Sequence, residues 1–232
     1  CRNYYDVLVL YDKSISTSSM MVNQGIVGGL VGFVSHDDTN NVVSLGLVMN
    51  YGNITVIPAS ADVGGLFGFV SGGGDKDNTK LSINGDNYGD IIARNSDTVG
   101  GLIGSISNGA DITGLSTCGV AETLSNGTKR EIIVTINGAK YVGGLMGRAS
   151  NIYIPTKSNI ARVYANITAT ASDGYAGGIF GGVWTSNIPL GNVVYWPIPF
   201  APILEYPFNV VKGTTITGKH TSEYAGYRNL DA

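Results

Sequence analysis

Histidine and carboxylate side chains could carry acid–base chemistry in this chain, and both are sparse. The 232 residues include two histidines, His36 and His220, and 17 Asp and Glu residues. A nucleophilic site needs a base beside the nucleophile, but each histidine lies in polar sequence typical of a solvated loop. Glycoside cleavage needs two carboxylates about 5 to 9.5 Å apart, and Asp62 and Asp97 could stack on neighbouring strands. Because no strand carries a regular pattern of acids, we predict no catalytic residues.

Metal and cofactor sites also lack a convincing pattern. The segment Asp75–Asn78 has spaced oxygen ligands, as a calcium loop does, but it lacks the downstream bidentate Glu of an EF-hand. The glycine-rich phrases of the chain have neither the Gly-Lys-Ser/Thr of a phosphate loop nor a strand-to-helix GxGxxG fingerprint. We therefore expect no metal and no cofactor.

Covalent modification has five candidate residues. Cys1 and Cys118 are too few for a zinc site by themselves. They could form one disulfide, pair with neighbouring chains or stay reduced, and the sequence leaves these alternatives open. Sequons at Asn53, Asn126 and Asn166 permit N-glycosylation, although about as many arise by chance in so polar a chain.

The composition excludes some partners. Only 13% of the residues are charged, against about 25% in an average domain, and the net charge is -3. Because no basic patch is present, we expect no nucleic-acid partner. No apolar run reaches 18 residues, so we expect no membrane span. Low charge with abundant Ser, Thr, Asn, Gly and Tyr favours an extracellular or cell-surface protein, and the start at Cys1 suggests a piece of a longer chain.

A glycine-rich phrase that occurs five times is the strongest pattern. The copies are "VGGLVGFV", "VGGLFGFV", "VGGLIGSI", "VGGLMGRA" and "AGGIFGGV". They begin at Val27, Val63, Val99, Val142 and Ala176, which gives intervals of 36, 36, 43 and 34 residues. Columns one, four, five and eight are apolar in every copy. The glycines that fill columns two, three and six are Gly28, Gly29, Gly32, Gly64, Gly65, Gly68, Gly100, Gly101, Gly104, Gly143, Gly144, Gly147, Gly177, Gly178 and Gly181.

This phrase predicts strand structure. Three glycines in six residues disfavour a helix, and the β-branched, aromatic and Leu residues between them favour a strand. We expect each phrase to be one core strand covered on both faces. Its Gly-Gly pair marks a bulge, a bend or a close backbone approach, and its third glycine receives a side chain from a facing layer. Turns at Asn50–Gly52 and Asn87–Gly89 repeat as well.

A repeat period of 20 to 50 residues is typical of solenoids and propellers. We predict an all-β fold: a β-helix-like β-solenoid of five GG(L/I)xG rungs with parallel strands, formed by residues 1–185. Residues 186–232 form an irregular C-terminal segment, because 186–208 holds five of the seven prolines. We expect this segment to be a cap or an inter-subunit contact, with a degraded repeat at 223–227. Its predicted assembly contacts are Trp196, Phe200, Tyr206 and Phe208.

The recurrent phrase resembles the GLUG-motif repeats of large secreted and surface proteins, including bacterial adhesins and IgA-specific peptidases. The resemblance covers roughly residues 20–185 and implies a non-catalytic, β-rich surface region with no catalytic residue attached to the motif. We therefore expect a structural or adhesive extracellular module that assembles with copies of itself into an array or filament. The alternative is a β-helix that binds or cleaves polysaccharide, with surface glycans as partners.

Overall fold

The computed structural model describes residues 1–10, 25–36, 43–57, 62–72, 81–107, 110–112, 116–150, 161–171, 174–178, 180–184, 211–212 and 215–216. The regular secondary structure in this part of the chain consists of β-strands alone, so the all-β prediction is confirmed there. Among these residues no helix is long and apolar enough to cross a membrane.

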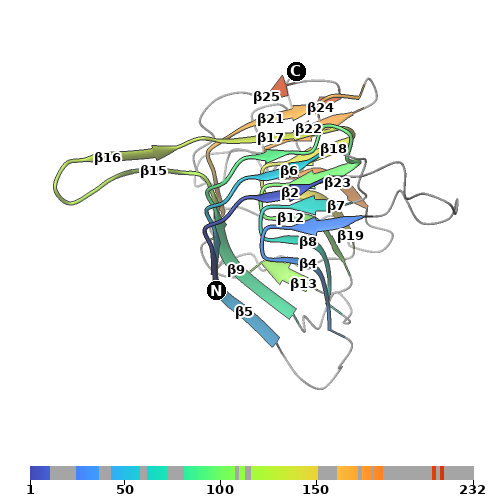
Figure 1. Cartoon of the computed structure of the whole chain (residues 1–232), viewed down its shortest axis with the longest axis horizontal. Coiled ribbons are helices and arrows are strands. Elements are labelled where there is room, and N and C mark those ends of the chain that lie inside the picture. The colour runs from blue at the N-terminus through green and yellow to red at the C-terminus, as the bar shows by residue number, and fades with distance from the viewer. Residues whose placement is uncertain are drawn as a thin grey trace, which may run out of the picture.

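Most strands belong to four sheets, which we name A to D in the order in which the chain visits them (Figure 1). Sheet A contains β1 (Arg2–Asn3), β5 (Val43–Asn50), β9 (Leu81–Asn87), β14 (Ser116–Cys118) and β20 (Ala161–Val163), with β13 (Ala110–Ile112) also beside β9. Sheet B contains β2 (Val7–Val9), β6 (Ile54–Val56), β10 (Ile91–Ile92), β17 (Val134–Gly138), β21 (Ala165–Ala169) and β25 (Thr215–Ile216).

The glycine phrases build the other two sheets. Sheet C contains β3 (Ile26–Gly28), β7 (Asp62–Gly64), β11 (Thr98–Gly100), β18 (Tyr141–Gly143), β22 (Tyr175–Gly177) and β24 (Val211–Lys212). Sheet D contains β4 (Val31–Ser35), β8 (Phe67–Ser71), β12 (Ile103–Ser107), β19 (Met146–Ser150) and β23 (Phe180–Trp184). Apart from β24 and β25, all these strands pair in parallel, which is consistent with a β-helix-like fold.

Equivalent residues of the phrases pair with one another. Val63 is in register with Val27 on one side and with Val99 on the other, and Val99 pairs in turn with Val142. Because parallel strands lie about 4.8 Å apart, each phrase adds one strand to sheet C and one to sheet D. The parallel stacking expected from the sequence is confirmed.

The expectation that each phrase forms one continuous strand is wrong. In the second copy, β7 ends at Gly64, the chain bends at Gly65 and Leu66, and β8 begins at Phe67. A Cβ on Gly64 would lie 2.6 Å from the Gly104 nitrogen and would overlap the Phe67 carbonyl, so this fold-back requires glycine.

The third glycine of the phrase faces main chain more than side chains. A Cβ on Gly104 would lie 2.7 Å from the Val63 nitrogen and would overlap the Gly68 carbonyl. The strand that carries Gly104 in sheet D therefore lies directly against the sheet C strand of the preceding repeat. A facing side chain does contribute at Gly68, where Ile26 Cγ2 would be 2.5 Å from an added Cβ.

The apolar columns form one core. Its buried members from the phrases are Val27, Val63, Val99, Val142, Ala176, Leu66, Leu102, Leu145, Phe67, Ile103, Met146, Phe180, Val70, Ile106 and Ala149. Sheet B contributes Ile54, Ile91, Ile136 and Ile167. The first phrase is the exception, because Val31 is 43% exposed at the edge of sheet D.

An antiparallel hairpin extends the interval between the third and fourth phrases. It consists of β15 (Val120–Thr123) and β16 (Lys129–Ile132), and it projects from the stacked strands (Figure 1). Four residues of the predicted C-terminal segment are described: β24 pairs with β22 and β25 with β21, both antiparallel. The predicted contacts Trp196, Phe200, Tyr206 and Phe208 and the echo at 223–227 lie outside the described residues.

Candidate functional site: a corner of stacked asparagine and tyrosine

Three short segments of similar sequence connect sheet A to sheet B. They are "NYYD" at 3–6, "NYGN" at 50–53 and "NYGD" at 87–90. Each begins with the last residue of a sheet A strand and ends just before a sheet B strand. The predicted turns at Asn50–Gly52 and Asn87–Gly89 are two of these segments. Sequence reasoning missed the first copy because it lacks the glycine, although its Asn-Tyr pair was a usable signal.

The asparagines of these segments form a ladder inside the corner. Asn3 Nδ2 donates to Asn50 Oδ1 and Asn50 Nδ2 donates to Asn87 Oδ1, each at 2.8 Å. The Nδ2 groups of Asn50 and Asn87 also reach main-chain oxygens: Asn50 donates to Gly52 O at 2.7 Å and Asn87 to Gly89 O at 2.9 Å. Because Asn50 and Asn87 are fully buried, these bonds satisfy side chains that would otherwise destabilise the core.

The second glycine of each of the first two phrases makes room for this ladder. A Cβ on Gly65 would lie 2.5 Å from Asn87 Cγ, and one on Gly29 would lie 2.9 Å from Asn50 Cγ. In the next repeat, a Cβ on Gly101 would lie 2.6 Å from Cys118 Sγ. The glycine phrase and the Asn-Tyr corner are thus two halves of one packing arrangement.

Cys118 continues the asparagine ladder. It is in register with Asn87, whose Nδ2 lies 4.0 Å from Cys118 Sγ. Burial raises the pKa of this thiol to about 12. Cys1 is exposed, and both thiols are free. The register aligns Cys118 with Asn3 across three strand spacings, roughly 14 Å, and Cys1 lies two residues further along, so the two cysteines are beyond disulfide reach. The intramolecular disulfide is therefore excluded.

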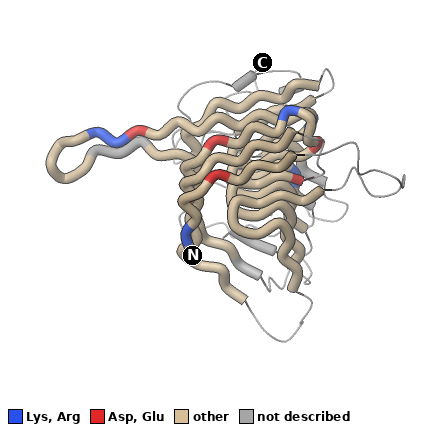
Figure 2. Tube along the Cα trace, in the orientation of Figure 1, with Lys and Arg blue, Asp and Glu red and all other residues tan. Residues whose placement is uncertain are grey.

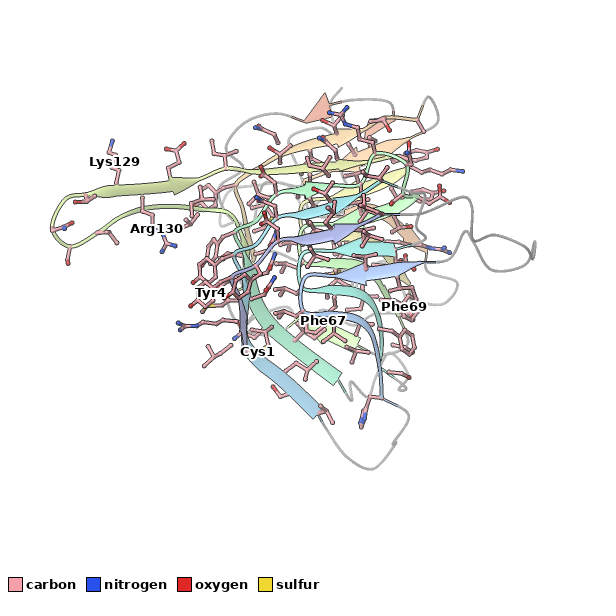
Figure 3. All side chains as sticks on the ribbon, in the orientation of Figure 1. Cys1, Tyr4, Phe67, Phe69, Lys129 and Arg130 are labelled. Atoms are coloured by element: carbon pink, nitrogen blue, oxygen red, sulfur yellow. The ribbon has the colours of Figure 1, made fainter. Side chains whose placement is uncertain are left out.

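The tyrosines of the corner form a second ladder on the surface. Tyr4 stacks on Tyr51, and Tyr51 on Tyr88, with ring centroids 5.0 Å apart in both pairs. The Arg130 guanidinium of the hairpin lies 5.3 Å from the centroid of the Tyr88 ring. Figure 3 labels Arg130 on the hairpin and Tyr4 at the corner. Burial raises the pKa of Tyr88, and the nearby Asp86 carboxylate raises it further. Both faces of the Tyr51 ring are covered, so a sugar ring cannot stack on them.

A third ladder joins the corner to sheet B. Asp6 Oδ1 accepts the Asn53 backbone N–H at 2.7 Å, Asn53 Oδ1 accepts that of Asp90 at 2.9 Å, and Asp90 Oδ1 accepts that of Thr135 at 2.7 Å. Each side chain thus caps the equivalent residue of the next repeat. Asn53, one of the three sequon asparagines, is exposed, and this bond uses its Oδ1 rather than the Nδ2 that a glycan would occupy.

Asp62 is the first residue of β7 in sheet C, away from this corner. Its Oδ1 accepts a hydrogen bond from the Ser105 hydroxyl. Burial raises the pKa of the Asp62 carboxyl, and the Asp97 charge adds to the rise, while Ser105, Arg148 and Thr98 oppose it. The predicted stacking of Asp62 with Asp97 is wrong, because Asp62 pairs in register with Thr98.

The remaining predicted residues lie apart. Asn126, at the hairpin tip, is exposed, and its Oδ1 accepts the Thr128 N–H at 2.9 Å. Asn166 is half-buried on β21, and the His36 backbone N–H donates to Ser71 O at 3.0 Å. His220 and Asp75–Asn78 lie outside the described residues. Within the part of the chain that the structure covers, no three His, Cys, Asp or Glu residues are grouped as metal ligands would be.

Comparisons with known proteins add no relative. No family model matches the chain, and neither a curated protein nor a solved structure matches it.

Proposed function

We propose that the chain is a non-catalytic structural or adhesive module of the cell surface or extracellular space, built as a β-solenoid of five rungs. Polar side chains that hold neighbouring strands together support this proposal most directly. The carboxylates of Asp6 and Asp90 accept backbone N–H groups of the next repeat, and Asp86 Oδ1 accepts both the backbone N–H and the hydroxyl of Thr117. Such groups serve stacking, which suits a rod or scaffold.

The distribution of charge agrees with this role. Charged residues are few along the stacked strands, and the projecting hairpin carries both signs (Figure 2). Lys129, Arg130 and Glu131 are all exposed there. The resemblance to GLUG-motif repeats points the same way and rests on the five phrases alone.

We further propose that the module associates with copies of itself through the proline- and aromatic-rich segment 189–208. The test is sedimentation velocity over a concentration range on the full chain and on a variant lacking residues 189–208. The proposal predicts an oligomer for the full chain and a folded monomer for the deletion variant. A full chain that stays monomeric would contradict self-association. A deletion variant that unfolds would instead identify the segment as a lid.

A further inference from the structure

The third position of the corner segment distinguishes the first repeat from the next two. This position is Tyr5 in the first segment, Gly52 in the second and Gly89 in the third. The register of β2, β6 and β10 makes the three residues equivalent. Their local bonding also matches: the Asn Nδ2 two residues earlier donates to the carbonyl of Tyr5 at 2.7 Å, of Gly52 at 2.7 Å and of Gly89 at 2.9 Å.

Glycine at this position has a steric cause. A Cβ on Gly89 would lie 2.6 Å from the Gly52 carbonyl carbon and would overlap its oxygen. A Cβ on Gly52 would lie 3.0 Å from the Asp6 nitrogen and would overlap the carbonyl of Tyr5. The Cβ direction at this position therefore points at the carbonyl of the preceding repeat. Neither glycine has a positive φ, so the reason is space and not backbone conformation.

Tyr5 occupies this position at the edge of the stack, and it is 82% exposed. Strands β1 and β2 are the terminal strands of sheets A and B in the described part of the chain. A strand added below them in the same register would place its carbonyl oxygen where the Tyr5 Cβ points. We propose that Tyr5 closes this edge against in-register addition of a parallel strand from a second copy of the chain.

The other features of the edge would favour such a strand. The Asn3 side chain donates to Asn50 above it, and its Oδ1 would accept an Asn Nδ2 from below, as Asn50 and Asn87 do. Tyr4 stacks on Tyr51 with one face, and a tyrosine of the added strand would extend the stack on the other face. Unpaired strand edges template association unless something blocks them. The Cβ of Tyr5 is the block. This proposal depends on the parallel stacking. If the edge is closed, the proposed self-association must use other surfaces.

A peptide with the sequence of residues 48–56, VMNYGNITV, tests this directly as a probe strand. Fluorescence anisotropy of the labelled peptide would be compared for the wild type, Tyr5→Gly and Tyr5→Ala, with circular dichroism to show that all three are folded. The alanine variant is the matched control, because it removes the ring and keeps the Cβ. We expect Tyr5→Gly to bind at least about tenfold more tightly than the other two, a difference of about 1.4 kcal/mol. A peptide with Ala in place of its first Asn should lose that gain.

Two results would overturn the inference. Equal binding by Tyr5→Ala and Tyr5→Gly would show that the ring, and not the Cβ, guards the edge. Absence of binding by Tyr5→Gly would show that Tyr5 is not what closes it. Neither result bears on whether the wild type self-associates, because sedimentation measures that independently.

Discussion

Gly104 provides the sharpest test of how the phrases pack. A Cβ there would lie 2.7 Å from the Val63 nitrogen, whereas ordinary contacts of a Cβ begin at 3.4 Å. The Gly104→Ala change therefore requires β12 and β7 to separate by at least about 0.7 Å, the difference between these distances. The added Cβ would also overlap the Gly68 carbonyl, and because the Val63 nitrogen and the Gly68 carbonyl are both main chain, no side chain can rotate away. Overpacking costs about 1 to 3 kcal/mol, and the rigid neighbours place this site at about 3 kcal/mol.

Gly46 is the matched control, because a Cβ there would meet nothing within 4 Å. Gly46→Ala should be neutral or stabilise by up to about 1 kcal/mol, since it lowers the entropy of the unfolded chain. Urea denaturation followed by circular dichroism gives both free energies of unfolding. For a chain of this length we expect the Tm of Gly104→Ala to fall by about 6 to 12 °C. If the two variants agree within about 1 kcal/mol, the close packing of sheets C and D is refuted.

Three further predictions concern ionisable groups. Since burial raises the pKa of Asp62 above its ordinary 3.8, its contribution to stability is complete below that pH and is lost as the pH rises through the raised value. Asp62→Asn should remove this loss. If the unfolding free energies of the wild type and Asp62→Asn differ by a constant amount over that pH range, the assignment is contradicted. In the native protein at pH 8 a thiol reagent should modify Cys1 and not Cys118, whose buried thiol has a pKa of about 12, and both should react in denaturant. Arg130→Ala should cost about 0.5 to 1 kcal/mol by removing the contact with Tyr88 and should speed proteolysis of the hairpin; unchanged cleavage would show that the contact does not anchor it.

The repeat, the apolar columns and the parallel pairing could be predicted from the sequence because they repeat along the chain. Val63, Leu66 and Val70 are buried as their columns predicted. The bend inside the phrase could not be located, because Gly-Gly in a strand pattern is equally typical of a bulge, a bend or a close approach. The fold-back at Gly64 in the structure shows that the pair marks a bend.

The corner was harder to predict, because its contacts join residues far apart in sequence. Asn50 reads as a turn residue, and its burial follows from Asn87 one strand away and Gly29 opposite. The pairing of Cys118 with Asn87 has no sequence signal, since the two residue types differ. The hairpin did have a sequence signal, the Asn126-Gly127 pair between two strand-like runs. The repeat pattern around it made this signal easy to miss.

Distances along one column of sheet B test the central claim, that each repeat adds one parallel strand in register. Leu8 is in register with Thr55, then with Ile92, Asn137 and Thr168. Pairs of spin labels at Leu8 and each later position, in a Cys1→Ser background with Cys118 buried, would be measured by pulsed electron spin resonance. Backbone separations should rise by about 4.8 Å per repeat, to roughly 19 Å at Thr168. Distances that fail to increase evenly from repeat to repeat would contradict the stacking.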